Sequence, residues 1–224
     1  MVQAENIYKF FGEKEILRGI NIRVKKGNIV CILGESGAGK STLLHILGTL
    51  EKPTFKKKEK TVLKIDGENV LSLSEKKLSI IRNEKIGFVF QSPQLLPEFT
   101  ALENVCLPRF IKIKNRGHVK KKAKKLLKKL HLSPYENSKP EELSGGQKQR
   151  LSVARALIND PKIIFADEPS GNLDLKNAKN LHDLFFFLRE ELEQTFLIVT
   201  HNLQLADMAD EKLKIKNGKV NKIQ

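Results

Sequence analysis

Short runs of consecutive apolar residues alternate with helical patterns along much of this sequence. The runs at 29–33, 162–166 and 195–199 are typical of strands that are buried on both faces of a parallel sheet. Residues 41–47 and 178–193 carry apolar positions at helical spacing, and Gly48 is placed to cap the first of these helices. A strand, a helix and a second strand at this spacing predict a βαβ unit, and therefore an α/β protein with a parallel sheet.

Between residues 100 and 132 the pattern becomes helical. Thr100 and Glu103 form a capping box, which satisfies two unpaired backbone donors at the start of a helix. Ser133 and Pro134 end the helical segment, and a loop follows. An apolar stripe, with lysines on the remaining faces, precedes this end and consists of Val119, Ala123, Leu126, Leu127 and Leu130.

The composition indicates a folded protein with its own core. Of the 224 residues, 40% are hydrophobic and 30% are charged, so we do not expect wholesale disorder. No apolar run approaches the roughly 18 residues that a membrane-spanning helix needs, and the first residues do not have the pattern of a secretory signal. Cys31 and Cys106 alone predict neither a disulfide framework nor a metal cluster. We therefore expect a soluble, cytosolic chain.

The net charge is +15, because 41 Lys and Arg residues exceed 26 Asp and Glu residues. A charge of this size attracts polyanions such as nucleic acid or an anionic membrane face. A lysine-rich surface that only keeps the protein hydrated explains the same excess, since much of it lies in local runs. The run at 56–60 is interpreted as an exposed loop or turn.

Residues 34–41 read Gly-Glu-Ser-Gly-Ala-Gly-Lys-Ser and fit the phosphate-binding pattern G-x-x-x-x-G-K-[ST] in full. A buried strand precedes this loop and a helix follows it, as the motif requires. The glycines let successive backbone N–H groups point inward at the helix N-terminus, where they form a nest for anions. We expect Lys40 to reach the β- and γ-phosphates of a nucleoside triphosphate, and the Ser41 hydroxyl to ligate Mg²⁺.

Two acidic residues, Asp167 and Glu168, follow the apolar run at 162–166. They therefore lie at the C-terminal edge of the predicted sheet, where parallel sheets place their ligand sites. We expect Asp167 to hold the Mg²⁺ shell and Glu168 to orient and deprotonate the attacking water.

A second candidate anion receptor lies at residues 143–147, which read Leu-Ser-Gly-Gly-Gln. Ser144 and Gln147 form another capping box, and a helix is predicted over 148–158, so amide dipoles stand exposed behind a diglycine. This turn falls in the helical segment rather than beside the phosphate-binding loop.

These elements resemble, in order and across essentially the whole chain, those of ATP-binding cassette (ABC) ATPases. The resemblance implies a P-loop NTPase (RecA-like) parallel-sheet core over about 1–91 and 159–224, an N-terminal antiparallel β part, and an inserted α-helical subdomain over about 92–158, all in one domain. The matching elements are the loop 34–41, Gln91 after the run 87–90, the turn 143–147, Asp167 with Glu168, residues 170–174 (Ser-Gly-Asn-Leu-Asp), and His201 after a strand.

The resemblance also implies a role for individual residues. Phe11 is the expected aromatic that stacks on adenine, and Gln91 the residue that touches Mg²⁺ and the water. Glu168 is the expected catalytic base, and His201 contacts the γ-phosphate together with Lys40. Contacts to ATP on one subunit are expected from Gly34, Glu35, Ser36, Gly37, Ala38, Gly39, Lys40, Ser41 and Thr42. A head-to-tail homodimer adds Ser144, Gly145 and Gly146 from the other subunit, with Asp174 communicating between the two.

Residues 90–105 narrow the resemblance to lipoprotein-releasing (Lol) ATPases and macrolide exporters. This branch implies two integral membrane permease subunits as partners and a peripheral position on the cytoplasmic side of the inner membrane. In it, the segment after Gln91 receives a coupling helix of the membrane subunit. Leu95, Leu96 and Pro97 fit such docking, and core of the helical subdomain is the alternative interpretation.

Two other functions stay open. A cell-division ATPase of the same branch has a similar Leu-Leu-Pro stretch, although residues 100–104 favour the Lol-like interpretation. A nucleic-acid-stimulated ATPase is suggested by the net charge, but the lysine-rich helix at 120–129 lacks aromatic residues for base stacking, so we expect no specific nucleic-acid partner. The sequence also departs from the family at 55–60, where lysines replace a Ser-Gly turn and put the following hairpin in question.

Overall fold

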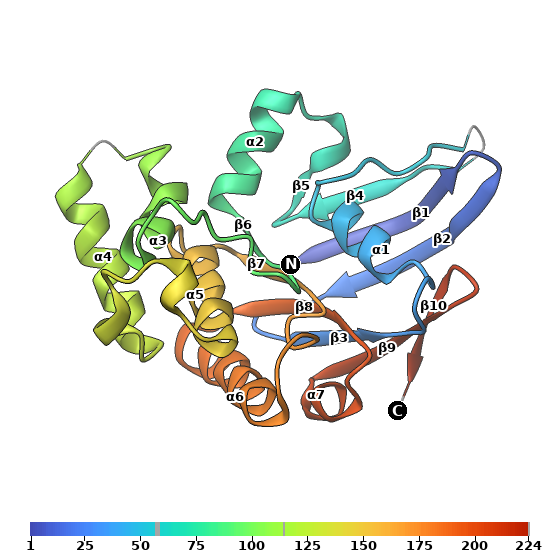
Figure 1. Ribbon diagram of the computed structural model, residues 1–224. Coiled ribbons are helices and arrows are strands. Elements are labelled where there is room, and N and C mark those ends of the chain that lie inside the picture. The colour runs from blue at the N-terminus through green and yellow to red at the C-terminus, as the bar shows by residue number, and fades with distance from the viewer. Residues whose placement is uncertain (57–58, 114, 224) are drawn as a thin grey trace.

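A six-stranded sheet forms the centre of the computed structural model, which describes residues 1–56, 59–113 and 115–223 (Figure 1). Its strand order is β10-β9-β3-β8-β7-β6, and only β10 runs antiparallel to its neighbour. The strands are β3 (Ile29–Leu33), β6 (Ile86–Val89), β7 (Ile163–Asp167), β8 (Thr195–Thr200), β9 (Glu211–Lys216) and β10 (Lys219–Ile223). The three predicted apolar runs thus become the neighbouring strands β3, β8 and β7, which confirms the parallel sheet.

A second sheet, antiparallel throughout, has the order β2-β1-β4-β5. Its strands are β1 (Val2–Phe11), β2 (Lys14–Val24), β4 (Val62–Ile65) and β5 (Glu68–Asn69). This sheet confirms the expected N-terminal antiparallel β part. The hairpin that follows residues 55–60, which the lysine run made uncertain, is present as β4 and β5. Lys57 and Lys58 of the preceding lysine run lie outside the described residues, and Lys56 is half-buried with its ammonium 3.9 Å from the centroid of the Tyr8 ring.

Side chains of the buried central strands alternate between two cores, as the period of a β-strand requires. In β3, Ile29, Cys31 and Leu33 face a core shared with the helices α3, α4, α5 and α6. Val30 and Ile32 face the other core, which contains α1, α2 and the antiparallel sheet. The helices are α1 (Lys40–Leu47), α2 (Glu75–Glu84), α3 (Ala101–Phe110), α4 (Arg116–Lys129), α5 (Gly145–Leu157), α6 (Leu175–Leu192) and α7 (Leu203–Met208).

Both predicted capping boxes are present. Thr100 starts α3, with its hydroxyl accepting from the Glu103 N–H at 3.3 Å and its own N–H donating to the Glu103 carboxylate at 2.9 Å. Ser144 and Gln147 make the same exchange at the start of α5, with distances of 3.3 and 2.7 Å.

Two predicted helix starts were wrong by three residues. α5 begins at Gly145 rather than at 148, because Ser144 is the N-cap and the diglycine forms the first turn. α6 begins at Leu175 rather than at 178, because the Asp174 carboxylate accepts from the Asn177 N–H at 2.9 Å and caps the helix there.

The helices α3 to α5 lie in the chain between β6 and β7, to one side of the sheet in Figure 1. The boundaries of a separate helical subdomain at about 92 and 158 remain a prediction, because these helices share a core with α6 and one face of the sheet. Cys31 and Cys106 are free and buried. Within the described ranges, no helix combines the length and apolar character that crossing a bilayer requires.

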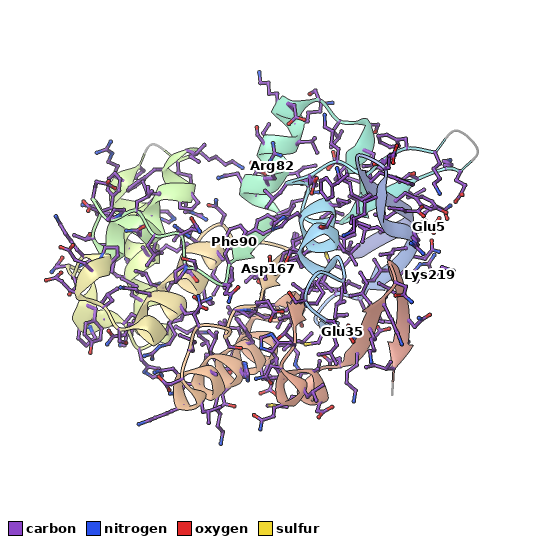
Figure 2. The ribbon with its side chains drawn as sticks, turned by 45° about the vertical axis from the view of Figure 1, so that its right-hand side comes forward. Glu5, Glu35, Arg82, Phe90, Asp167 and Lys219 are labelled. Carbon is purple, nitrogen blue, oxygen red and sulfur yellow. The ribbon has the colours of Figure 1, made fainter. Side chains whose placement is uncertain are left out.

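The C-terminal ends of the parallel strands meet at one edge of the sheet. Glu35, in the loop after β3, and Asp167, at the end of β7, both lie at this edge (Figure 2). The direction of the strands therefore brings the phosphate-binding loop and the Asp167–Glu168 pair to the same edge.

Candidate functional site

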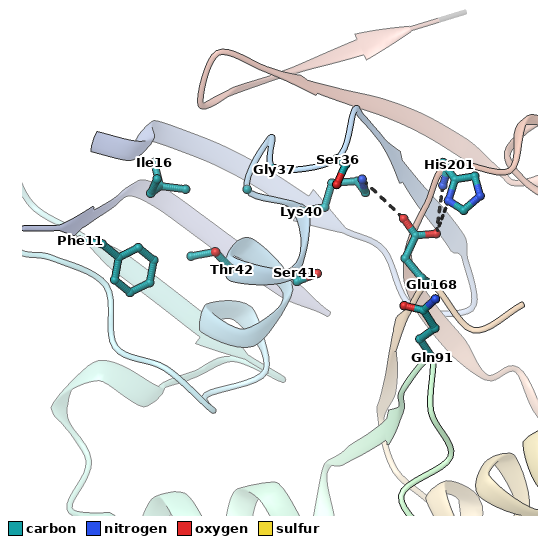
Figure 3. Close-up of a pocket in the computed structure, with 11 residues that line it drawn as sticks. Phe11, Ile16, Ser36, Gly37, Lys40, Ser41, Thr42, Gln91, Glu168 and His201 are labelled. Atoms are coloured by element: carbon teal, nitrogen blue, oxygen red, sulfur yellow. Dashed lines mark hydrogen bonds and ion pairs between the residues drawn. The ribbon is translucent and has the colours of Figure 1, made fainter. Parts of the chain in front are cut away.

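A cavity of about 540 Å³ lies at this edge of the sheet, around the loop between β3 and α1 (Figure 3). Phe11 and Ile16 line one end of it, and Gln91, Glu168 and His201 line the other. The wall between these ends comes from the loop and the first turn of α1, through Ser36, Gly37, Gly39, Lys40, Ser41 and Thr42. The cavity thus has an apolar end and a charged end, joined by the phosphate-binding loop.

Two glycines give the loop its shape. Gly37 and Gly39 have φ angles of 77° and 97°, in the left-handed region that residues other than glycine rarely adopt. Gly39 is also the N-cap of α1 and supplies no side-chain hydrogen bond. The first N–H groups of α1 consequently receive no hydrogen bond from the N-cap side chain, an arrangement that can receive an anion.

Lys40 is buried and lies across its own loop. Its ammonium donates to the carbonyls of Gly34 and Glu35 at 2.8 and 3.0 Å, and it lies 3.5 Å from the Glu168 carboxylate. The positive charge is therefore held at the charged end of the cavity.

Ser41 and Asp167 meet as the motif predicted. The Ser41 hydroxyl donates to Oδ1 of Asp167 at 2.9 Å, although the two residues come from α1 and β7. Burial raises the pKa of the Asp167 carboxyl above its ordinary value, and the Ser41 hydrogen bond and the nearby His45 and Lys40 oppose this rise. Two adjacent hard oxygen donors are the arrangement that Mg²⁺ prefers.

Glu168 follows β7 in a strained conformation, with a φ of 43°. Its Oε2 accepts from the His201 backbone N–H at 3.2 Å and lies 2.9 Å from the His201 Nδ1. Its other oxygen faces Lys40. The carboxylate is thus fixed between two groups that the sequence also assigned to the site.

Gln91 lines the cavity, and its amide is hydrogen-bonded elsewhere in the same protomer. Its Nε2 donates to Oδ1 of Asn172 at 2.9 Å. Gly171 makes this approach possible, because a Cβ at that position would lie 2.9 Å from the Gln91 Nε2. The sequence reasoning missed Asn172, whose polar side chain inside the 170–174 loop was the available signal.

Phe11 stands at the end of β1, next to the turn that leads into β2, with 52% of its surface exposed. Its neighbour across the cavity wall is Ile16 of β2, which the sequence reasoning did not single out. The Lys9 ammonium lies 5.0 Å from the centroid of the Phe11 ring. An open aromatic face beside an aliphatic side chain can receive a flat heterocycle.

Ser144, Gly145, Gly146 and Asp174 do not line this cavity. The start of α5 packs instead on the start of α6, where Asn177 contacts Gly146 closely. Asn177 donates its backbone and side-chain N–H groups to Asp174 at 2.9 and 2.6 Å, and these bonds lower the pKa of the Asp174 carboxyl. Within one chain the predicted residues therefore form two groups, as the sequence anticipated for the 143–147 turn.

Three polar side chains from the helical segment hold residues 90–99, and the sequence reasoning missed all of them. Gln149 of α5 donates to the Phe90 carbonyl at 2.9 Å. Arg155 of α5 donates to the carbonyls of Pro93 and Gln94 at 2.7 and 2.6 Å. The buried Asn104 of α3 exchanges hydrogen bonds with the backbone of Leu96 at 2.9 and 3.0 Å. The helix that starts at the 143–147 turn thus also anchors the segment after β6.

Comparison with known proteins decides the family. A family model described as ABC transporter matches residues 17–171 of this chain. The chain belongs to the ABC transporter family. Both the phosphate-binding loop and the Asp167–Glu168 pair lie within the matched cassette.

Curated relatives of this cassette include ATP-binding proteins of lipoprotein-releasing systems. It is 50% identical over 218 residues to the lipoprotein-releasing system ATP-binding protein LolD of Cytophaga hutchinsonii, a match that covers 97% of each chain. It is also 50% identical over 222 residues to LolD of Bacteroides thetaiotaomicron, which covers 99% of the cassette and 100% of the relative.

Solved structures agree with the observed fold. The dimeric structure of MJ0796, a bacterial ABC transporter cassette, has a TM-score of 0.88 at 39% identity and covers 100% of this cassette and 99% of that chain. A dimeric post-hydrolysis state of MJ0796 bound to ADP and Pi has a TM-score of 0.87 at the same identity, with the same coverage of 100% and 99%. The predicted P-loop NTPase fold and the assignment as an ATP-binding, ATP-hydrolysing cassette are thereby confirmed.

Proposed function

We propose that this cassette hydrolyses ATP to drive separate membrane subunits that release lipoproteins from the membrane. The observation that carries this proposal is the identity of about half of all positions to LolD proteins over nearly the whole chain. The charged end of the cavity supports the chemistry, and the exposed apolar residues after Gln91 support the coupling to a membrane partner.

The apolar and charged ends of the cavity correspond to the adenine and the phosphates of ATP. Adenine would stack on Phe11 and contact Ile16, at the apolar end. The phosphates would lie along the loop and accept hydrogen bonds from the first N–H groups of α1. The Lys40 ammonium, which now donates to the carbonyls of Gly34 and Glu35, would donate to phosphate oxygens instead.

Mg²⁺ fits the donors present at the charged end. Ser41 and Asp167 would hold it through a hydroxyl and a carboxylate oxygen, with Gln91 as a further contact. Phosphate oxygens and water would complete the shell of such an ion. When bound, Mg²⁺ neutralises charge on the phosphate oxygens.

Hydrolysis would use Glu168 as the base. Its carboxylate takes a proton from the attacking water while the oxygen of that water bonds to the γ-phosphorus. The bond from the γ-phosphorus to the bridging oxygen breaks, and ADP and phosphate form. His201 holds Oε2 of Glu168 in place, so the carboxylate needs little reorientation before it reacts.

Two copies in head-to-tail arrangement would complete each site. The turn at 143–147 lies outside the cavity of its own protomer, with Ser144 and Gly145 exposed, so a second copy can reach it. MJ0796, a cassette with the same fold, forms a dimer.

The segment after Gln91 is the proposed docking surface for the membrane subunits. Leu96 and Phe99 expose 44% and 37% of their surface, whereas Leu95 packs against the core. The exposure of Leu96 supports the docking interpretation, and the packing of Leu95 supports the core interpretation. The cassette would be peripheral, on the cytoplasmic side of the inner membrane, with two permease subunits above the dimer.

Reconstitution tests the proposal. Membrane subunits that copurify with the cassette are identified and inserted into proteoliposomes loaded with a fluorescent lipoprotein. We expect ATP-dependent release with the wild-type cassette, none with Glu168→Gln, and weaker copurification with Leu96→Asp. Copurification with a cell-division membrane subunit and no lipoprotein release would support the alternative within the same branch. Hydrolysis stimulated by DNA in a salt-sensitive way would support the nucleic-acid alternative.

A further inference from the structure

His45 lies on the same face of α1 as Ser41, because the two residues are one helical turn apart. Both side chains face the carboxylate of Asp167. The Ser41 hydroxyl donates to Oδ1 at 2.9 Å, and Nε2 of His45 lies 3.7 Å from Oδ2. The two oxygens of one carboxylate are therefore approached by two successive turns of one helix.

The Nε2 atom of His45 is buried and has no hydrogen-bond partner among the described residues. A buried polar atom without a partner costs free energy, so such an atom in a folded protein calls for an explanation. The ring packs edge-on against Phe90, with centroids 6.4 Å apart and an interplanar angle of 65°. Phe90 and Asp167 lie close together at the centre of the molecule (Figure 2). This contact holds the ring where Nε2 faces Asp167.

We infer that His45 is a positioning residue that holds the second carboxylate oxygen of Asp167, so that Ser41 and Asp167 keep the orientation in which they receive the divalent cation. The inference rests on the proposed role of these two residues. A neutral imidazole with its proton on Nε2 can donate to Oδ2. The distance of 3.7 Å exceeds a direct hydrogen bond, and a small rotation of either side chain closes it.

The physical reason is the rotational freedom of a carboxylate. The single hydrogen bond from Ser41 restrains rotation about the bond to the β-carbon only in part, and a donor on the second oxygen restrains it further. When a residue that hydrogen-bonds to a metal ligand is removed, the metal affinity typically falls by about 10- to 100-fold. His45 is in the position of such a partner.

Two polar substitutions of different reach test the inference. In His45→Gln the side-chain amide extends about as far as Nε2, whereas in His45→Asn it stops near the level of Nδ1. Binding of Mn²⁺ to the ADP-loaded protein is measured from the electron paramagnetic resonance signal of the free ion, a readout that needs no hydrolysis. We expect about tenfold weaker Mn²⁺ binding in His45→Asn and a change within about threefold in His45→Gln.

Controls separate this role from a general loss of structure. Both variants should bind a fluorescent ATP analogue without metal as the wild type does, and should keep its thermal unfolding temperature. His118→Leu, at an exposed histidine of α4, should leave all three measurements unchanged. If His45→Asn binds Mn²⁺ as tightly as the wild type, or if both variants weaken binding equally, the inference is overturned. Unchanged Mn²⁺ binding in Ser41→Ala and Asp167→Asn would instead overturn the proposed cation site itself.

Discussion

The amide of Gln91 donates a hydrogen bond to the side chain of Asn172 at 2.9 Å. This contact links the segment after β6, which holds the proposed docking surface, to the 170–174 loop, which ends at Asp174 and the start of α6. Gln91 and Asn172 thereby connect the charged end of the cavity with two proposed surfaces. One is the docking surface for the membrane subunits, and the other is the region of Asp174 that we assign to the contact with a second copy.

Asn172→Ala should release Gln91. Because a single hydrogen bond contributes about 0.5–1.5 kcal/mol, we expect kcat to fall by about two- to tenfold while the affinity for ATP without metal stays the same. Asn172→Asp keeps an acceptor for the Gln91 amide and should retain most of the activity. Steady-state hydrolysis and binding of a fluorescent ATP analogue measure the two effects. Equal losses in both variants would show that the hydrogen bond is not responsible.

Glu168→Gln should bind ATP normally and hydrolyse it poorly. The amide cannot accept the proton of the attacking water, and the loss of a general base typically costs about 10²- to 10⁴-fold in rate. Single-turnover hydrolysis, together with analogue binding, measures the change, and Glu98→Gln at an exposed glutamate serves as the matched control. Near-normal turnover by Glu168→Gln contradicts the assignment of the base.

A mixture of two inactive variants should recover activity if each site is shared between two copies. Lys40→Ala damages the phosphate-binding loop, and Ser144→Arg blocks the turn that we assign to the partner's site. A mixed dimer places both defects in one site and leaves the other site intact. We expect hydrolysis by the mixture to exceed clearly that of either variant alone. No recovery, in samples shown by light scattering to contain dimers, would place each complete site within one chain.

Stability should depend on pH through His182 of α6. Its Nε2 lies 3.0 Å from the Ser170 hydroxyl in a buried position, and burial lowers the pKa of the imidazole below its ordinary value of 6.5. As the pH falls through about 6.5, the unfolded chain takes up a proton that the folded protein does not yet bind. The contribution of this group to stability is therefore fully present above this pH and is lost below it.

Urea unfolding at about pH 7.5 and 5.5 checks this expectation. The free energy of unfolding of the wild type should fall more between these two values than that of His182→Gln, which cannot titrate in the range. An equal fall in both proteins would show that other groups cause the pH dependence.

Local features of the site were predictable from the sequence because their physical causes are local. The glycines of the loop 34–41 determine a backbone shape, and Thr100 and Ser144 satisfy N–H groups three residues away. The apolar runs predict strands that are buried on both faces, whichever strands become their neighbours. The two errors, at the starts of α5 and α6, were also local, because Ser144 and Asp174 cap their helices earlier than the apolar pattern begins.

Only the tertiary structure decided which side chains meet across elements. His45 faces Asp167 because β7 lies in the sheet order next to β8 and close to α1, and no spacing along the chain encodes that order. Gln91 reaches Asn172 because Gly171 leaves room for its amide. Such contacts join residues that are far apart in sequence, and their geometry depends on how whole strands and helices pack. The sequence therefore determined the chemical groups of this site, and the fold determined their neighbours.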